Sequence, residues 1–283
     1  MRTASPLRYP GGKAVLANVL AQTRSLNGLG DLVLAEPFAG GAGASLPLLY
    51  GEEVPAIWIN DADQAIHDFW WAVTERSSAI LNLLRDTPVT IDEWLRQRSV
   101  YRRGTASRVR RGFAAFYLNR CNRSGIIIDG GPIGGIKQSG AWKIDARFNK
   151  KGLESRLARV AEYRERISVS GTDGMELIRR AEHENAFLSV DPSYYYKGEE
   201  LYLNSVDTTY HEALAAQMRL LKSPWILTYD DCPETRRIYR GWANIRGFSL
   251  RYAAAERRVD AEILISPKWL MLPATQTSAA IGW

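Results

Sequence analysis

Short apolar runs alternate with longer amphipathic stretches in two separated parts of the chain. Runs of this kind lie at 32–36 and 56–60 in the first part, and at 167–170, 186–190, 225–228 and 261–266 in the second. Apolar strands that alternate with helical patterns are typical of a mostly parallel sheet covered by helices. The pattern therefore predicts an α/β fold.

The residues between these two parts have a different character. From about Arg76 to Arg159, helical patterns lead into a glycine-rich and basic segment at 119–151. Its central sequence Gly-Gly-Pro-Ile-Gly-Gly, at 130–135, is typical of a loop or hairpin rather than of a core element. We therefore predict a discontinuous main domain and an inserted, mainly helical subdomain with a basic loop or hairpin. The main domain comprises residues 1–75 and 160–283, and the subdomain comprises residues 76–159.

Composition agrees with a globular protein that has a charged partner. The chain has 283 residues, of which 46% are hydrophobic and 24% are charged, which suffices for one large domain with a subdomain. The formal net charge is +6, and the basic excess lies between Arg96 and Arg166. Such a cluster indicates a polyanionic partner, although composition alone leaves open that it is a solvated surface.

The cysteines and the apolar runs exclude several classes of protein. Cys121 and Cys232 are too few for a disulfide framework, and neither has the close Cys or His neighbours that a zinc site requires. The first residues lack the apolar stretch of a signal peptide, and no apolar run approaches the length of a membrane span. We expect a cytoplasmic protein with no metal and no membrane segment.

Two motifs follow predicted strands. Residues 36–43 read Glu-Pro-Phe-Ala-Gly-Gly-Ala-Gly and lead into a helix predicted to begin near Ser45, while residues 191–194 read Asp-Pro-Ser-Tyr after the apolar run 186–190. Small residues in the first motif allow a bulky cofactor to approach the backbone. Because the carboxyl ends of parallel strands meet at one edge of a sheet, we expect the two motifs to lie side by side.

These motifs, taken in order, resemble the D12 class of S-adenosylmethionine-dependent DNA adenine N6-methyltransferases, the family that contains the Dam enzymes. The resemblance covers essentially the whole chain, and it is carried by residues 6–13, 36–43, 60–61, 119–125, 173, 191–194, 227–231 and 262–265. It implies a Rossmann-like class I methyltransferase sheet with helices on both faces, and it identifies the insertion as a target-recognition subdomain.

The resemblance also implies an activity and its partners. The expected enzyme transfers a methyl group from S-adenosyl-L-methionine to the N6 amino group of an adenine flipped out of double-stranded DNA, at a short target sequence. We expect a monomer or weak dimer in the cytoplasm of a bacterial or phage-infected cell, where it belongs to a restriction-modification system or works without a partner endonuclease.

Two positions depart from the sequence that is usual in that family. The family's loop has three successive glycines, whereas here Ala42 stands in the third place and Gly43 follows it. The family's Asp-Pro-Pro-Tyr has a second proline where this chain has Ser193. A proline there would restrict the backbone of Pro192, so we expect the serine to cost roughly 0.4–1 kcal/mol of preorganisation. A slower enzyme is expected, not an inactive one.

The parts of the methyl donor call for different side chains. By the resemblance, Lys13 pairs with its carboxylate, Asp61 accepts from its ribose hydroxyls, and Asp173 accepts from its adenine amino group. The resemblance adds six further cofactor-binding residues, which are Tyr9, Gly11, Gly12, Phe38, Gly40 and Gly41. Alternatives stay open, because either aspartate is also placed to cap a following helix and Lys13 is also explained as a surface charge.

The catalytic residues implied by the resemblance are Asp191, Pro192, Ser193 and Tyr194. The amino nitrogen of adenine is a poor nucleophile because its lone pair is delocalised into the ring. Acceptors at the Asp191 carboxylate and the Pro192 carbonyl would localise that lone pair, and Tyr194 would stack on the flipped base. The simpler alternative is a turn after a strand. His211, at the start of a predicted helix, is interpreted as structural rather than as a general base.

The basic insertion supplies the expected DNA contacts. Predicted DNA-binding residues are Asn119, Arg120, Asn122, Arg123, Pro132, Lys137 and Arg147. The arginines and the lysine suit phosphates, the asparagines suit base edges, and Pro132 suits a wedge in the base stack. For Asn119 and Arg120 an equally good alternative is that they close a helix and buttress the catalytic domain.

Two other functions remain compatible with the sequence. One is a DNA-binding protein of the same fold whose catalysis is impaired, for which Ser193 is the only indication. The other is an enzyme that methylates adenine in RNA, because the chemistry at the amino nitrogen is the same.

Overall fold

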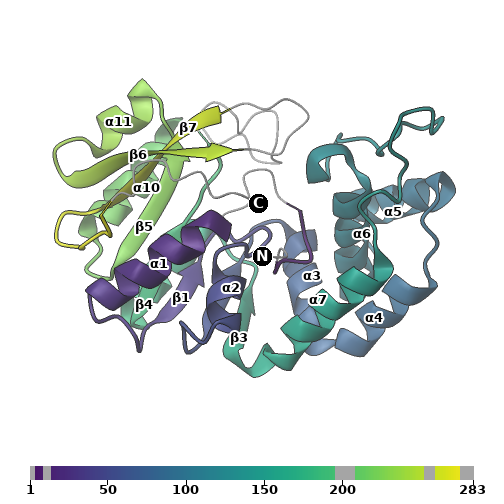
Figure 1. Cartoon of the computed structure of the whole chain (residues 1–283), viewed down its shortest axis with the longest axis horizontal. Coiled ribbons are helices and arrows are strands. Elements are labelled where there is room, and N and C mark those ends of the chain that lie inside the picture. The colour runs from purple at the N-terminus through teal and green to yellow at the C-terminus, as the bar shows by residue number, and fades with distance from the viewer. Residues whose placement is uncertain (1–3, 9–13, 195–207, 252–258, 275–283) are drawn as a thin grey trace.

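The computed structural model describes residues 4–8, 14–194, 208–251 and 259–274, and within them the strands form one seven-stranded sheet (Figure 1). The order across the sheet is β3-β2-β1-β4-β5-β7-β6. The strands are β1 (Val33–Glu36), β2 (Ile57–Asn60), β3 (Ile167–Ser170), β4 (Ala186–Val190), β5 (Trp225–Asp230), β6 (Ala243–Arg251) and β7 (Val259–Pro267). Strands β1 to β5 are parallel, whereas β7 runs antiparallel to both β5 and β6.

The strand order reverses between β1 and β4. The chain runs outward through β2 and β3 on one side of β1, and it then returns to place β4 and β5 on the other side. In β1, Leu34 pairs with Phe187 and Ala35 with Leu188 of β4. In an open α/β sheet, the crevice outside the carboxyl ends of the strands at such a reversal is where ligands bind.

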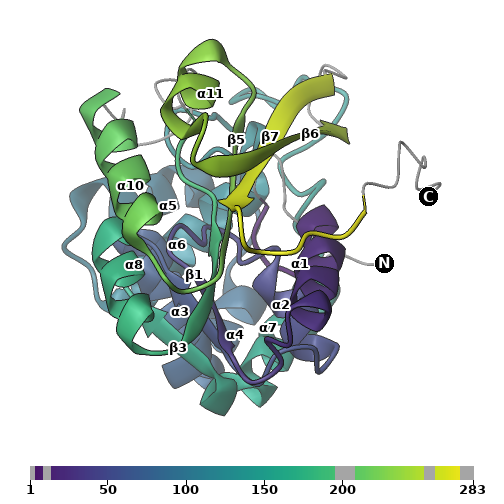
Figure 2. The ribbon, with the colours of Figure 1, turned by 90° about the vertical axis from the view of Figure 1, so that its left-hand side faces the viewer.

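Helices cover both faces of the sheet, because alternate strand residues point to opposite sides. Leu34 and Ile57 belong to a core shared with α1 (Ala14–Leu26), α2 (Ser45–Tyr50) and α3 (Gln64–Glu75). Ala35 and Trp58 belong to a second core, shared with α8 (Gly174–His183), α10 (Thr208–Leu220) and α11 (Pro233–Tyr239). Figure 2 shows α1 and α2 on the side of the sheet opposite α8 and α10.

The insertion contributes four helices that continue the first core. They are α4 (Ser77–Asp86), α5 (Ile91–Arg103), α6 (Arg108–Cys121) and α7 (Lys150–Glu162). A short 3-10 turn, η1 (Arg123–Gly125), follows α6, and a second, η2 (Arg164–Arg166), lies between α7 and β3. Helix α6 lies along α3, where the rings of Phe69 and Phe116 stack with centroids 5.4 Å apart. A Cβ atom at Gly112 would lie 2.5 Å from the backbone of Phe69, so only glycine permits this approach. The insertion thus packs directly on the sheet domain through a shared core.

The predicted α/β sheet is confirmed, and one strand was missed. Each apolar run expected to form a strand does so, as β1 to β5 and β7. Strand β6 was not predicted because Arg246 and Gly247 interrupt its apolar pattern. It forms by pairing with β7, in which Ile265 lies opposite Ile245.

Two further expectations can be compared with the described residues. No helix among them is both long enough and apolar enough to cross a bilayer. The same residues contain no group of three or more histidine, cysteine or acidic side chains able to hold a metal ion. Cys121 and Cys232 are buried free thiols.

Candidate active site

The turn after β1 is fixed by hydrogen bonds to its neighbours in the sheet. The Ala39 N–H donates to the carbonyl of Asn60 at 2.8 Å, and the Trp70 indole donates to the carbonyl of Gly40 at 2.8 Å. Gly40 and Ala42 both have left-handed backbones, with φ of 46° and 48°. A side chain is strained in that conformation, which explains why a glycine suits the position of Ala42. Helix α2 begins at Ser45, as predicted.

Asn60, at the end of β2, joins the ends of its two neighbouring strands. Its amide nitrogen donates to the carbonyls of Pro37 at 2.8 Å and Thr172 at 2.9 Å, and its oxygen accepts from the Ser170 hydroxyl at 2.7 Å. The side chain is fully buried, so water does not compete for these bonds. Asn60 therefore fixes the three loops that border one side of the crevice.

Asp61 lies directly against the glycine turn. Its two carboxylate oxygens accept from the backbone N–H groups of Gly40 and Asp63, each at 2.9 Å. Burial, with a smaller contribution from the charge of Asp63, raises the pKa of Asp61 to about 7. The Asp61 carboxylate is thus close to its protonation midpoint at neutral pH. Asp61 does not cap α3; the cap is Asp63, whose side chain accepts from the Ala65 N–H at 2.8 Å.

Glu36, at the end of β1, is a second acid of the crevice, and unlike the partly exposed Asp61 it is buried. Its carboxylate accepts from the Ser45 hydroxyl. Burial raises its pKa to about 7, and the nearby charge of Asp191 adds to this shift, while the Ser45 hydrogen bond opposes it. The sequence predicted that the motif containing Glu36 would lie beside the Asp191 motif, but it did not identify Glu36 itself as a site residue.

Asp191 follows β4, and a neighbouring strand holds its side chain. The hydroxyl of Thr228, in β5, donates to Asp191 Oδ1 at 2.6 Å. Pairing of Val190 with Leu227 brings the two residues together, and Thr228 is 1% exposed. The residue after Asp191, Pro192, is buried.

Tyr194 is held by the antiparallel part of the sheet. Its hydroxyl lies 2.5 Å from Glu262 Oε1, and it packs against the second core. Glu262, in β7, is 1% exposed and lies opposite Asp230 of β5. Ser193, between the two anchored residues, is partly buried. Sequence reasoning missed Thr228 and Glu262 as site residues, although both stand in motifs that carried the resemblance.

Phe38 and Asp173 border the crevice on the β3 side. A Cβ atom at Gly174 would lie 2.2 Å from the Phe38 ring, so the ring rests on the backbone at the start of α8. Asp173 is exposed and caps α8, because its side chain accepts from the Met175 N–H at 2.8 Å. Asp173 therefore caps the helix, as the alternative interpretation proposed. Because Asp173 is exposed, its second carboxylate oxygen remains accessible to a ligand.

Four predicted cofactor-binding residues, Tyr9, Gly11, Gly12 and Lys13, lie outside the described residues. The described residue that directly precedes them is Arg8, whose peptide N–H and carbonyl both bind the Asn119 side chain at 2.6 Å. Asn119 is fully buried and also donates to the Gly125 carbonyl at 2.8 Å. These are the contacts of a buttress, so a base edge does not reach Asn119 in this conformation.

Asn122 and Arg120 are also buried scaffold residues. Asn122 accepts from the indole of Trp94 at 2.7 Å and donates to the carbonyl of Ile126 at 2.7 Å. The Arg120 guanidinium donates twice to the Arg147 carbonyl, at 2.9 and 2.6 Å. Burial, followed by three nearby arginines, lowers the Arg120 pKa to about 9. Neither side chain presents its polar atoms to the surface in this conformation, which does not support the predicted DNA contacts.

The remaining predicted DNA contacts divide by exposure. Arg123, Lys137 and Arg147 are exposed, whereas Pro132 is buried and bridges to Asn122. The exposed apolar side chains of this loop are instead Ile136, at 54%, and Trp142, at 73%. Neither was named from the sequence, although Trp142 stands between Lys137 and Lys143.

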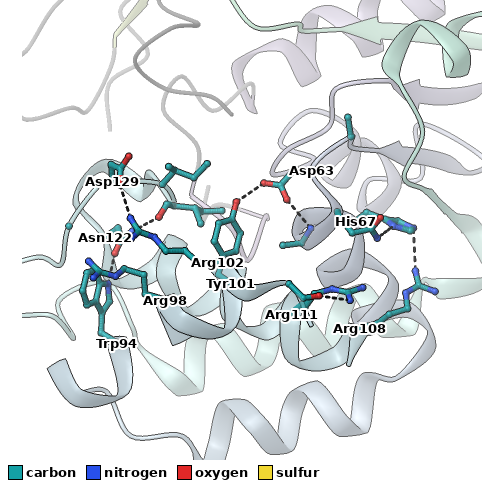
Figure 3. A pocket seen from close by; sticks show the side chains of 17 residues that line it. Asp63, His67, Trp94, Arg98, Tyr101, Arg102, Arg108, Arg111, Asn122 and Asp129 are labelled. Atoms are coloured by element: carbon teal, nitrogen blue, oxygen red, sulfur yellow. Dashed lines mark hydrogen bonds and ion pairs between the residues drawn. The ribbon is translucent and has the colours of Figure 1, made fainter. Parts of the chain in front are cut away.

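A cavity of about 1020 Å³ opens between the start of α3, α5, the start of α6 and the loop at 122–131 (Figure 3). Its arginines include Arg108 and Arg111, which share the buried Asp68, and Arg102, which pairs with Asp129. Arg98 lies over the Trp94 ring at 4.8 Å and forms no ion pair with a described carboxylate. The cavity therefore presents a guanidinium able to take an anion.

His211, in the first turn of α10, packs against Tyr229 of the second core. It is 2% exposed, and its Nδ1 lies 2.5 Å from the Tyr229 hydroxyl. These surroundings agree with the structural interpretation of this histidine.

The comparisons with known proteins give one family. A model of the D12 class N6 adenine-specific DNA methyltransferases matches residues 9–254, which is well over half of the chain. A search of curated proteins found no match. The matched range includes the glycine turn, the residues at the end of β2 and the Asp191–Tyr194 segment. The chain therefore belongs to the D12 class N6 adenine-specific DNA methyltransferase family, and it is an enzyme.

Proposed function

We propose that the protein transfers a methyl group from S-adenosylmethionine to the N6 amino group of an adenine flipped out of double-stranded DNA. The observation that carries the proposal is the position of Asp191. Its carboxylate follows β4 at the reversal of strand order, beside the glycine turn after β1 and within electrostatic reach of Glu36. A ligand in that crevice meets both motifs at once.

The described residues around the glycine turn fit such a donor. The Asp61 carboxylate is oriented by the Gly40 N–H and remains partly exposed, which suits ribose hydroxyls. The partly exposed ring of Phe38 offers apolar surface, and exposed Asp173 offers acceptor oxygens for an adenine amino group. When bound, the donor supplies an electrophilic methyl group on a positively charged sulfur.

The protein's own groups activate the target nitrogen. The Asp191 carboxylate accepts one amino N–H, and the Pro192 carbonyl accepts the other, which localises the lone pair on nitrogen. Both acceptors are present whatever residue stands at 193. The amino proton becomes acidic only after transfer and leaves to solvent, so no strong base is required. Tyr194 stacks on the flipped base, which offsets part of the few kcal/mol that flipping costs.

The insertion, residues 76–159, acts as the target-recognition subdomain in this proposal. Exposed Arg123, Lys137 and Arg147 contact phosphates, and Arg98 in the cavity is available for a further one. Trp142, rather than buried Pro132, is the better wedge where the adenine leaves the stack, because an exposed aromatic ring can stack between bases.

Incubation of the purified protein with labelled donor and duplex DNA tests the proposal. Nucleoside analysis by mass spectrometry should find N6-methyladenine, and Asp191→Ala should abolish it while donor binding persists. A structured RNA of the same sequence serves as the competing substrate. If adenines remain unmodified in duplexes of varied sequence, the proposal is wrong. A faster reaction on RNA than on DNA would show that RNA is the substrate.

A further inference from the structure

The segment Asp191–Tyr194 has one proline where two would make it rigid. Pro192 fixes its own φ, but Ser193 leaves the ψ of Pro192 and its own φ unrestricted. A flexible segment has to be held by its surroundings if its acceptors are to point in one direction. Both ends of this segment are in fact bound by side chains of neighbouring strands.

The first contact holds the carboxylate. Thr228 Oγ1 donates to Asp191 Oδ1 at 2.6 Å, from the middle of β5. A bond to one oxygen sets the rotation of the carboxylate about its Cβ–Cγ bond, and it thereby sets the direction of the second oxygen. Thr228 is buried at 1% exposure in a paired strand, so neither water nor backbone motion weakens the contact.

The second contact holds the aromatic ring. The Tyr194 hydroxyl and Glu262 Oε1 are 2.5 Å apart, within the range of a strong hydrogen bond to a carboxylate. The hydroxyl is the end of the ring farthest from the backbone, so this contact limits both tilt and translation of the ring. Glu262 is itself fixed in β7 by pairing with Asp230 of β5.

We propose that Thr228 and Glu262 are positioning residues of the active site, and that their hydrogen bonds supply the rigidity that a second proline at position 193 would supply. The inference rests on the proposed function, because it assumes that Asp191 and Tyr194 contact the target adenine. Thr228 and Glu262 act through those two residues and do not touch the base themselves.

Steady-state kinetics on duplex DNA test the proposal with matched variants. Thr228→Val removes the hydroxyl and keeps the shape, and it should lower kcat by about 10- to 100-fold, as expected for loss of a hydrogen bond to a charged group, with donor Kd unchanged. Thr228→Ser should restore most of the rate. Thr23→Val is the control, because Thr23 is equally buried and its hydroxyl donates to the Val19 carbonyl in α1.

Two further variants test whether the contacts substitute for proline. Glu262→Gln keeps an acceptor without charge and should slow transfer less than Thr228→Val. Adding Ser193→Pro to Thr228→Val should recover part of the lost rate, so that the two changes are non-additive. Wild-type kcat in Thr228→Val, equal impairment of Thr228→Ser, or strict additivity with Ser193→Pro would each overturn the proposal.

Hydrogen exchange separates this inference from the proposed function. In the protein without ligands, peptides that cover 190–194 should exchange faster in Thr228→Val and in Glu262→Gln than in wild type, while Thr23→Val should leave them unchanged. If the wild type methylates no DNA, the proposed function fails, yet the exchange rates still decide whether these contacts hold the segment. Unchanged exchange in both variants would refute the positioning roles.

Discussion

The side chain of Asn119 binds both peptide groups of Arg8, which lies 111 residues earlier in the chain. The Asn119 oxygen accepts from the Arg8 N–H, and its nitrogen donates to the Arg8 carbonyl, each at 2.6 Å. The two bonds resemble the pair of hydrogen bonds that one residue makes to a neighbouring strand in a sheet, except that here a side-chain amide makes them. The insertion thereby fixes the residue that directly precedes 9–13, the segment expected to hold the donor's carboxylate.

Asn119→Ala should therefore affect both stability and donor binding. It leaves the partly buried peptide groups of Arg8 and the buried Gly125 carbonyl without the Asn119 partner, so the free energy of unfolding should fall by about 2 kcal/mol or more. Donor affinity, measured by calorimetry at a temperature where the variant is folded, should fall as well. The exposed Asn82→Ala in α4 is the control. If donor affinity survives in folded Asn119→Ala, segment 9–13 is not positioned through Arg8.

Glu36 makes stability depend on pH. Its pKa is raised from 4.5 to about 7 in the folded protein, so the folded state holds a proton that the unfolded state has lost. The stabilising contribution is complete below pH 4.5 and is lost as pH rises to about 7, and it amounts to at most about 3 kcal/mol. Glu36→Gln should make the unfolding free energy fall less steeply over this window, as followed by urea titrations, and the remaining slope comes from Asp61, whose pKa is also raised to about 7. An unchanged slope would show that another group is responsible.

Asp61 should make donor affinity depend on pH in the opposite direction. Its raised pKa, about 7, means that the carboxylate becomes ionised between about pH 6 and pH 8. The ionised form is the stronger acceptor for hydroxyl groups and favours a cationic ligand. Donor Kd should fall as pH rises through this range, and Asp61→Asn should weaken binding and remove the trend. Asp31→Asn, at an exposed acid, is the control. A pH-independent wild type would exclude Asp61 as the ribose acceptor.

The sequence predicted what depends on local pattern. Apolar runs gave the strands, and the position of polar motifs after β1, β2 and β4 placed Phe38, Asp61 and Asp191 at one edge of the sheet. Side-chain contacts between residues far apart in the sequence could not be predicted from it. Nothing in the sequence indicates that Thr228 meets Asp191 or that Asn119 meets Arg8, because these pairs form only once strands align and helices pack.

The basic insertion shows the same limit. Charge and glycine content indicated a nucleic-acid surface, and exposed Arg123, Lys137 and Arg147 agree with that composition. Composition does not tell which polar side chains turn inward. Asn122 and Arg120 donate to backbone carbonyls of the long loop that follows α6. A loop of this length has little regular structure, so its peptide groups need side chains as hydrogen-bond partners.

Lys137 should contribute to DNA affinity in a salt-dependent way. The side chain is exposed in the basic loop, and each phosphate contact releases condensed counterions. Lys137→Ala should lower the slope of log K against log salt by about 1, with an equal effect on different sequences. Lys222→Ala is the matched control. Lys222 is exposed and precedes β5, so it lies at the amino ends of the parallel strands, whereas the candidate site lies at their carboxyl ends. Equal slopes in the two variants would remove Lys137 from the interface.

The shared core predicts that the insertion and the sheet unfold together. Helix α6 touches α3 through Gly112, and Arg108 and Arg111 of α6 both bind Asp68, which is fully buried in α3. Removing one partner from a buried charged cluster typically costs about 3–5 kcal/mol.

Asp68→Asn and Gly112→Ala should each lower the temperature of one single calorimetric transition. Asp68→Asn removes a charge from the α3–α6 contact, and Gly112→Ala adds a methyl group to it. Either change should destabilise the insertion and the sheet together, because their residues form one continuous core. Asp92→Asn, at an exposed acid of α5, should leave the transition where it is. Two transitions, of which only one responds to Gly112→Ala, would show instead that residues 76–159 fold as an independent subdomain.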